Sequence, residues 1–311
     1  MLIIGHRGCH YPKYNQNTIR AYKKVVEDGA KAFEMDVQLT ADDALVVVHN
    51  LDLTMVSNGK GLIRDKTLSE VKQLWAGRIE DGKDKIPELY EVFDLIASYP
   101  KDSRPTLNLE LKGEGTGRPS AILFKNDYLD FGKIDIKNIL VSSFNWNELR
   151  EFRKVIPEIE VALLDGSIRR KELLKLIPDG KKLFSQIFAY GEEDYMIPKT
   201  SNLDECIEYY SREIEDSHIR GIIIDEVTKC LEGGYYTDDL IKEAKKMNAF
   251  SLNLWANTVS GEFIKKCHDN DLKVYLYTVN DPKDLDVMKK IKPDGIFTDY
   301  FVETYNYINK D

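Results

Sequence analysis

Apolar and polar residues alternate with two different periods along this chain. Residues 33–38 alternate one by one, with Phe33, Met35 and Val37 separated by polar side chains, which is the pattern of a β-strand. Elsewhere apolar residues recur every three or four positions, which is typical of an amphipathic helix. Alternating or continuously apolar runs predict strands over residues 2–5, 33–38, 45–48, 106–112, 138–144, 160–164, 273–279 and 295–298.

Helix ends are marked as clearly as the strands. Asn17 or Thr18 can cap a helix that Gly29 closes, and Ser260 can cap another. Asp281 followed by Pro282 is the sequence of an N-cap and a first helical residue. Further apolar stripes predict helices through Leu89, Val92, Phe93 and Ile96, and through Leu149, Phe152 and Val155.

The order of these elements predicts the fold. Strands and helices take turns almost to the end of the chain, and repeated strand, helix, strand units form parallel sheets. There are enough units to close the sheet, so we expect a single α/β domain over residues 1–311, a (β/α)8 TIM barrel. An open doubly wound sheet is less favoured, because neither a G-x-G-x-x-G nor a Walker A motif opens any of the helices.

Two stretches interrupt this rhythm. Residues 50–85 follow a predicted hairpin and are too long for a simple loop, so we interpret them as a small inserted subdomain. Residues 166–249 form an irregular section of the barrel, with helical patterns and two apolar runs. Either residues 221–224 or residues 250–254 could supply the sixth barrel strand, and the pattern leaves both open.

The hairpin itself carries candidate chemistry. Glu34 and Asp36 are two residues apart in a strand, so their side chains leave the same face. A turn at Asp42 and Asp43 leads to a second strand, and the short connection predicts an antiparallel pair. Folding about this turn places Asp36 roughly opposite His49, so two acids and an imidazole would share one patch.

Other polar residues end predicted strands in the same way. In a TIM barrel the carboxyl ends of the strands form the catalytic face, where His6, Glu110 and Lys112 would join the hairpin. Each residue taken singly has a structural explanation, but a parallel barrel strand has no solvated face on which to display acids. Three converging carboxylates need a cation between them, and an all-oxygen ligand set favours Mg²⁺, Ca²⁺ or Mn²⁺ over zinc. Two histidines beside such a cation suit a general acid and base pair.

Composition narrows the function classes. Of the chain, 42% is apolar and 31% charged, as in a globular protein that buries a core. The formal net charge of −9 argues against a nucleic-acid surface, which needs basic patches. No apolar run approaches the roughly 18 residues of a membrane span, and Met1 leads directly into a strand, so we expect a cytoplasmic protein without a membrane span.

The cysteines favour reduced structural thiols. Cys9, Cys206, Cys230 and Cys267 are far apart and show no C-x-x-C spacing, which indicates neither a disulfide framework nor a zinc site. Cys9 lies close to His6 in sequence, so a cysteine nucleophile activated by histidine is a candidate. Nothing nearby supplies the third member of such a site, so we do not favour it.

Several motifs in correct order carry a resemblance to a known family. They are IGHRG at residues 4–8, Asn17 with Thr18, FEMDVQLT, VVVHN, NGKGLIRDKT, IPELYEVF, LNLELK, VSSF, VYLYTVND and DGIFTDY. Together they resemble the glycerophosphodiester phosphodiesterase family, over the first 164 and the last 60 residues. The resemblance implies a TIM barrel with a subdomain inserted after His49, and a small glycerophosphodiester substrate hydrolysed to glycerol 3-phosphate and an alcohol.

The resemblance also implies roles for individual residues. It implies one divalent cation, Mg²⁺ or Ca²⁺ with Mn²⁺ as a further candidate, and its ligands would be Glu34, Asp36 and Glu110. His6 and His49 would be the acid–base pair, with His6 favoured as the base and His49 as the acid. Arg7 and Lys112 would contact the substrate phosphate.

Three positions depart from the family pattern. Gln16 stands where the family usually has Glu, Asn50 where it usually has Asp, and Tyr277 where it usually has Trp. Gln16 and Asn50 each remove a negative charge near the site, which predicts weaker metal binding and less basic histidines than is typical.

Two alternative functions therefore stay open beside the glycerophosphodiesterase. One is a lipid phosphodiesterase of the phospholipase C or D kind, although the long insert and the retained carboxylates argue against it. The other is a phosphate-ester binding protein without turnover, which the two lost charges suggest. The alcohol group and the oligomeric state are not encoded in any motif.

Overall fold

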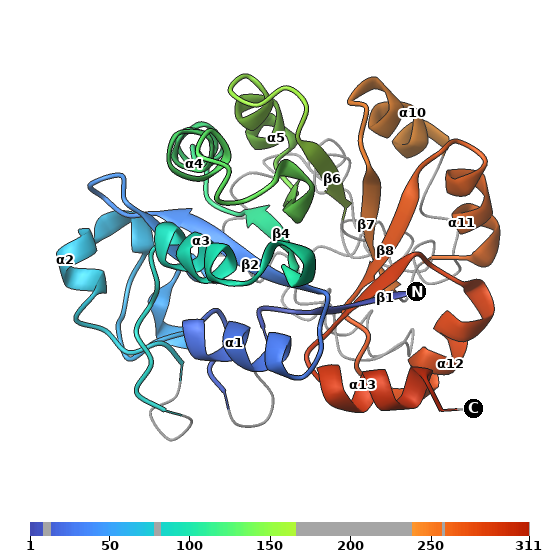
Figure 1. Ribbon diagram of the computed structural model, residues 1–311, viewed down its shortest axis with the longest axis horizontal. Coiled ribbons are helices and arrows are strands. Elements are labelled where there is room, and N and C mark those ends of the chain that lie inside the picture. The colour runs from blue at the N-terminus through green and yellow to red at the C-terminus, as the bar shows by residue number, and fades with distance from the viewer. Residues whose placement is uncertain (9–13, 78–81, 166–237, 257–258, 311) are drawn as a thin grey trace, which may run out of the picture.

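The strands of the protein close into a barrel (Figure 1). A computed structural model describes residues 1–8, 14–77, 82–165, 238–256 and 259–310. Within them the parallel strands are β1 (Leu2–Gly5), β2 (Ala32–Leu39), β4 (Thr106–Leu111), β5 (Ile139–Ser143), β6 (Glu160–Asp165), β7 (Ser251–Trp255), β8 (Lys273–Tyr277) and β9 (Gly295–Thr298). Each pairs with the next in this order, and β1 pairs with both β9 and β2. The expected TIM barrel is confirmed.

Helices surround the outside of this ring (Figure 1). They are α1 (Ile19–Glu27), α3 (Leu89–Ser98), α4 (Gly117–Phe124), α5 (Trp146–Arg153), α10 (Asp238–Lys246), α11 (Gly261–His268), α12 (Pro282–Ile291) and α13 (Phe301–Ile308). Their apolar stripes pack on the outward faces of the strands in one large core. Phe93 on α3, for example, is fully buried with its ring centroid 5.4 Å from that of Phe124 on α4, and burying such a side chain contributes roughly 1.5–3 kcal/mol. Among the described residues, every helix is too short or too polar to span a bilayer.

The inside of the barrel is divided into an apolar and a polar layer. Ile4, Ala32 and Phe297 belong to a small buried cluster, and each lies two residues before a polar residue on the same strand face. Those polar residues include His6 and Glu34. Because side chains on one strand face recur every second residue, the apolar layer lies directly beneath the polar one. On β1, β2 and β9 the inward polar side chains therefore lie at the carboxyl end of the barrel.

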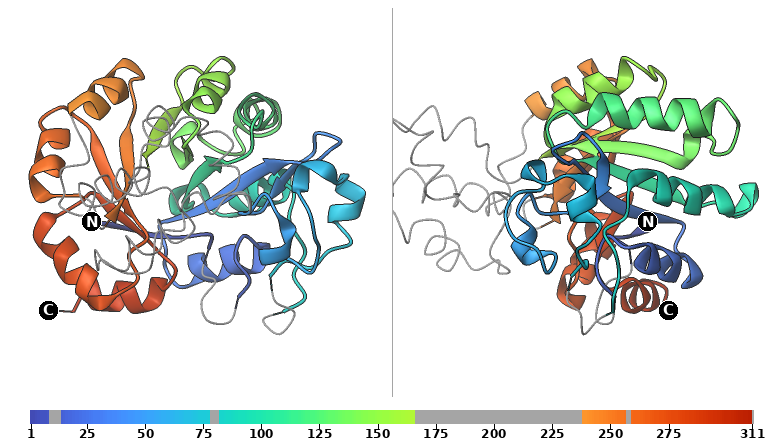
Figure 2. Two further views of the ribbon diagram at one scale, coloured as in Figure 1. Left: turned by 180° about the vertical axis from the view of Figure 1, so that it is seen from behind. Right: turned by 90° about the vertical axis from the view of Figure 1, so that its left-hand side faces the viewer.

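A separate small core packs against the hairpin. Strand β3 (Leu45–Val47) pairs antiparallel with β2. Beyond it lie the single-turn helices η1 (Leu53–Met55), η2 (Ile63–Asp65) and α2 (Leu68–Val71). Residues of this segment form their own buried cluster with Val46 and Val48, and the segment lies at one end of the barrel (Figure 2, right). The interpretation of residues 50–85 as an inserted subdomain stays a proposal, and this separate cluster supports it.

The strands predicted from the sequence agree closely with those of the structure. Strands β1 and β9 have the predicted bounds, and the others differ at their ends by one or two residues. The sixth barrel strand is Ser251–Trp255, which pairs with β6 on one side and β8 on the other. Residues 166–237, including the competing run at 221–224, lie outside the described residues. Helices α4 and α13 are not among the predicted helices, and α4 has the weaker amphipathic pattern of the two.

Candidate active site

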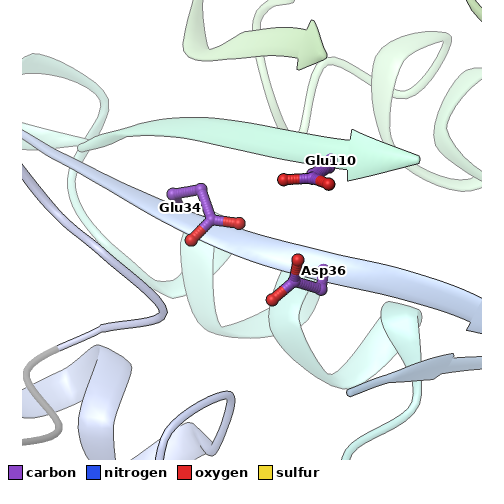
Figure 3. A group of neighbouring side chains, drawn as sticks. All are labelled: Glu34, Asp36 and Glu110. Carbon is purple, nitrogen blue, oxygen red and sulfur yellow. The ribbon is translucent and has the colours of Figure 1, made fainter. Parts of the chain in front are cut away.

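Strand register brings the three predicted carboxylates together. Glu34 and Asp36 leave the same face of β2, and Asp36 is directly paired with Glu110 in the β2–β4 ladder. One carboxylate oxygen from each residue lies within 4.8 Å of the others. All three are buried in the polar layer of the barrel, and Figure 3 shows Glu34 and Asp36 along β2 with Glu110 nearby on β4.

The turn after β1 contributes a cation and a backbone donor. Arg7 has a positive φ of 53° and Gly8 one of 84°, so the chain reverses sharply at the barrel mouth. The Arg7 backbone N–H donates to Glu34 Oε2 at 2.8 Å, and its guanidinium Nε lies 3.4 Å from Asp36 Oδ2. Gln16 accepts a hydrogen bond of 2.7 Å from the same guanidinium. Gln16 therefore orients Arg7 without adding the negative charge of a glutamate.

Asn17 links this turn to the carboxylates. It has a φ of 56°, and its side chain is buried. Its Nδ2 donates to Asp36 Oδ2 at 2.8 Å, and its Oδ1 accepts from the Tyr22 hydroxyl at 2.7 Å. Thr18, the next residue, caps α1 by accepting from the backbone N–H of Ala21. The choice left open between Asn17 and Thr18 is thus settled in favour of Thr18, and Asn17 supports the site.

Lys112 and His49 meet on the other side of Asp36. Lys112 Nζ lies 2.8 Å from His49 Nε2, 3.3 Å from Glu110 Oε1 and 3.6 Å from Asp36 Oδ1. A protonated lysine can only donate, so Nε2 of His49 is the acceptor and the ring proton resides on Nδ1. Nδ1 lies 2.7 Å from Asn50 Oδ1, which accepts the hydrogen bond from the ring N–H.

The position of His49 in the hairpin differs slightly from the expectation. The backbone N–H of Val48 bonds to the Asp36 carbonyl, so Asp36 is opposite Val48 and His49 follows one residue later. Gln38, buried on β2, donates to the carbonyls of both Val48 and His49 at 3.0 and 2.8 Å. This amide fixes the end of β3, and so the place of the imidazole.

His6 occupies the opposite side of the cluster. Its Nε2 lies 3.9 Å from Glu34 Oε2, and its Nδ1 lies 2.7 Å from Asp299 Oδ1. Asn280 donates to the other oxygen of that carboxylate at 2.7 Å. Asp299 was not singled out from the sequence, although it follows the last strand directly and the rule for strand ends covers it.

Electrostatics distinguish the three carboxylates. Burial, reinforced by the charges of Asp36 and Glu110, raises the pKa of Glu34 well above its usual value. Burial also raises the pKa of Glu110, although Lys112 opposes this. For Asp36 burial alone would raise the pKa, but His49, Lys112 and Arg7 together outweigh it and lower the pKa.

The two histidines have depressed basicity. Burial, followed by the neighbouring charge of Arg7, lowers the pKa of His6, while Asp299 acts in the opposite direction. Burial, Arg7 and Lys112 lower the pKa of His49 well below its usual value. The lowered pKa of each ring favours its neutral form, which has one nitrogen free to act as an acceptor.

The donor set fits a hard divalent cation. Glu34 Oε1 and Asp36 Oδ1 are buried and have no hydrogen-bond partner, which is costly unless something else binds them. The cluster offers carboxylate oxygens and neither sulfur nor imidazole, which is the ligand chemistry of Mg²⁺, Ca²⁺ and Mn²⁺. A cation at this point would also offset the repulsion among three buried negative charges.

Comparison with known proteins identifies the family. The model of the glycerophosphoryl diester phosphodiesterase family matches residues 6–177 and 185–303. A glycerophosphodiester phosphodiesterase of Caldanaerobacter subterraneus subsp. tengcongensis is 27% identical over 316 residues, which cover 99% of this chain and 98% of that one. A second, from Bacillus altitudinis, is 34% identical over 181 residues, covering 57% of this chain and 72% of the relative.

Solved structures share the fold. A phosphodiesterase of Oleispira antarctica, in complex with the product sn-glycerol-3-phosphate, superposes with a TM-score of 0.68 at 20% identity, covering 100% of this chain and 97% of that one. A protein of Galdieria sulphuraria gives 0.68 at 18% identity, covering 99% and 98%. The chain belongs to the glycerophosphoryl diester phosphodiesterase family and is a phosphoric diester hydrolase.

We expect Asn17→Ala to destabilise the protein. The variant removes the buried acceptor of the Tyr22 hydroxyl and the amide donor to Asp36 Oδ2, and it places alanine at a positive φ. Together these changes should cost about 2–4 kcal/mol in free energy of unfolding. Denaturant unfolding without added metal measures this. Asn248 is exposed with a φ of 46°, so Asn248→Ala is the control for backbone strain alone, about 1 kcal/mol. Equal losses in the two variants would contradict the supporting role of the Asn17 side chain.

Proposed function

We propose that the protein hydrolyses a glycerophosphodiester to glycerol 3-phosphate and an alcohol, using a divalent cation bound by Glu34, Asp36 and Glu110. One observation carries the proposal: these carboxylates share the barrel mouth with two imidazoles and two fixed cationic side chains. Family membership supplies the reaction class, and the names of the relatives supply the substrate class.

The cation would act as a Lewis acid on the phosphate and help to offset the charge that develops on its oxygens. Mg²⁺ and Ca²⁺ both suit the ligand set, and the choice between them stays a prediction, as does the cytoplasmic location. Arg7 and Lys112 place positive charge on either side of Asp36. From there they would bind the anionic phosphate oxygens and hold the diester in one orientation.

The two histidines would move the protons. His6, with a carboxylate behind its Nδ1, is suited to accept a proton on Nε2 from the attacking hydroxyl of water or of the substrate's glycerol. A new O–P bond forms as the bond to the leaving oxygen breaks. If water attacks, glycerol 3-phosphate forms directly; if the glycerol hydroxyl attacks, a cyclic phosphate would form first, and water would then open it to the monoester. His49 would donate a proton from Nε2 to the leaving oxygen. A bound phosphate anion would attract Lys112, which lies 2.8 Å from His49 Nε2, and its negative charge would favour the protonated ring.

Replacing either histidine should lower turnover. We expect His6→Ala and His49→Ala each to reduce kcat by on the order of 10² to 10⁴, measured as release of glycerol 3-phosphate. A substrate with a nitrophenolate leaving group needs no acid, so it should recover much of the loss in His49→Ala and little in His6→Ala. His268, half-exposed on α11, gives the control His268→Ala with unchanged activity. Full activity in His49→Ala would remove the proposed acid.

Removing the cation should abolish turnover. We expect a panel of glycerophosphodiesters to release glycerol 3-phosphate with Mg²⁺ or Ca²⁺ present and to release none with a chelator. By calorimetry, Glu110→Gln should weaken metal binding by at least 10- to 100-fold, whereas Glu158→Gln on the exposed surface should not.

The same panel separates the alternatives. Faster turnover of acylated than of deacylated substrates would favour a lipid phosphodiesterase. Tight metal and ligand binding without any product would favour a binding protein and contradict the proposal.

A further inference from the structure

Closure of the barrel places Asp299 against His6. Strands β1 and β9 pair in parallel with Gly5 opposite Thr298, and the His6 backbone N–H continues this ladder by bonding to the Thr298 carbonyl at 2.9 Å. Asp299 is the next residue along, so its carboxylate reaches the imidazole beside it. The Oδ1–Nδ1 distance of 2.7 Å is that of a strong hydrogen bond.

Asn280, which follows β8, clamps the same aspartate at two points. Its Nδ2 donates to Asp299 Oδ2 at 2.7 Å, and its Oδ1 accepts from the Asp299 backbone N–H at 2.9 Å. The neighbouring Thr298 hydroxyl is tied to Thr304 on α13 at 3.0 Å. Both oxygens of the carboxylate therefore have fixed partners, and its orientation is set by the ends of two strands.

We propose that Asp299, oriented by Asn280, is a positioning residue that holds His6 in the tautomer with the proton on Nδ1. The inference rests on the proposed function, in which Nε2 of His6 accepts the proton. A carboxylate can only accept a hydrogen bond, so the ring must direct N–H toward Asp299 and present its lone pair at Nε2. Nε2 then faces the Glu34 side of the site.

The Asn280 amide makes this inference sharply testable. In Asp299→Asn, the Nδ2 of Asn280 still requires an acceptor, so the new side-chain oxygen must turn toward Asn280 and the new NH₂ toward His6. An NH₂ group donates to Nδ1 and moves the ring proton to Nε2, which is the wrong tautomer for a base. The swap Asp299→Asn with Asn280→Asp reverses this, because a carboxylate at position 280 accepts from the new NH₂ and the new oxygen again faces His6.

The experiment compares kcat and KM for glycerophosphodiester hydrolysis among these variants, with thermal melting to verify folding. We expect Asp299→Asn to lower kcat by about 10² to 10⁴ with little change in KM. The kcat of the double variant Asp299→Asn with Asn280→Asp should be at least about tenfold higher than that of Asp299→Asn alone. A second aspartate–histidine pair, Asp294 with His268 at 2.8 Å, lies before β9 at the other end of the barrel. Asp294→Asn is therefore the matched control and should retain activity.

A spectroscopic measurement tests the same inference without turnover. Histidine ¹⁵N–¹H spectra, with His6→Ala for assignment, should show the Nδ1–H tautomer of the neutral ring in the wild type and the Nε2–H tautomer in Asp299→Asn. Wild-type kcat in Asp299→Asn, a swap no better than Asp299→Asn, or an Nε2–H ring in the wild type would each overturn the inference. If the wild-type protein hydrolyses no glycerophosphodiester but the spectra show the expected tautomers, the result would count against the proposed function and not against the role of Asp299.

Discussion

Repulsion among three buried carboxylates is the constraint on which this site depends. Glu34 and Asp36 are fixed by adjacent inward positions on β2, and the register with β4 places Glu110 directly beside Asp36. The backbone ladders prevent these groups from moving apart, and the apolar cluster that contains Ala32 lies below Glu34. Compensation must therefore come from other groups at the mouth, which are Arg7, Lys112, the Asn17 amide and the proposed cation.

The unusual backbone conformations of Arg7 and Asn17 serve to bring hydrogen-bond donors to the buried carboxylates. Arg7 and Asn17 both have positive φ values, an unfavourable state for arginine, and they bond to each other through the Asn17 N–H and the Arg7 carbonyl. In this conformation the Arg7 backbone N–H reaches Glu34 and the Asn17 amide reaches Asp36. The strain is thus local to the turn that neutralises the cluster.

Much of this arrangement is predictable from sequence, for identifiable reasons. The strand period places Glu34, Asp36, Glu110 and Lys112, because alternation fixes which face a side chain takes. Arg7 required a family resemblance, since no periodicity predicts an arginine with a positive φ two residues after the end of a strand. His49 was placed one residue off because hairpin register depends on turn geometry.

Long-range pairing explains what could not be predicted. Asp299 lies 293 residues from His6 in sequence, and only closure of the barrel makes the two neighbours. Likewise, residues 221–224 and 250–254 have equal claims as a strand by pattern, and pairing with β6 and β8 alone selects the latter. In the sequence Gln38 is one of the polar residues of the 33–38 alternation, and only the folded hairpin brings its amide to the carbonyls of Val48 and His49.

Crystals of the protein soaked in Mn²⁺ and measured for anomalous scattering test the central claim most directly. The account predicts a single strong peak at the barrel mouth, about 2.0–2.3 Å from oxygens of Glu34, Asp36 and Glu110. A peak bound elsewhere, or saturating Mn²⁺ with none at these carboxylates, would contradict it.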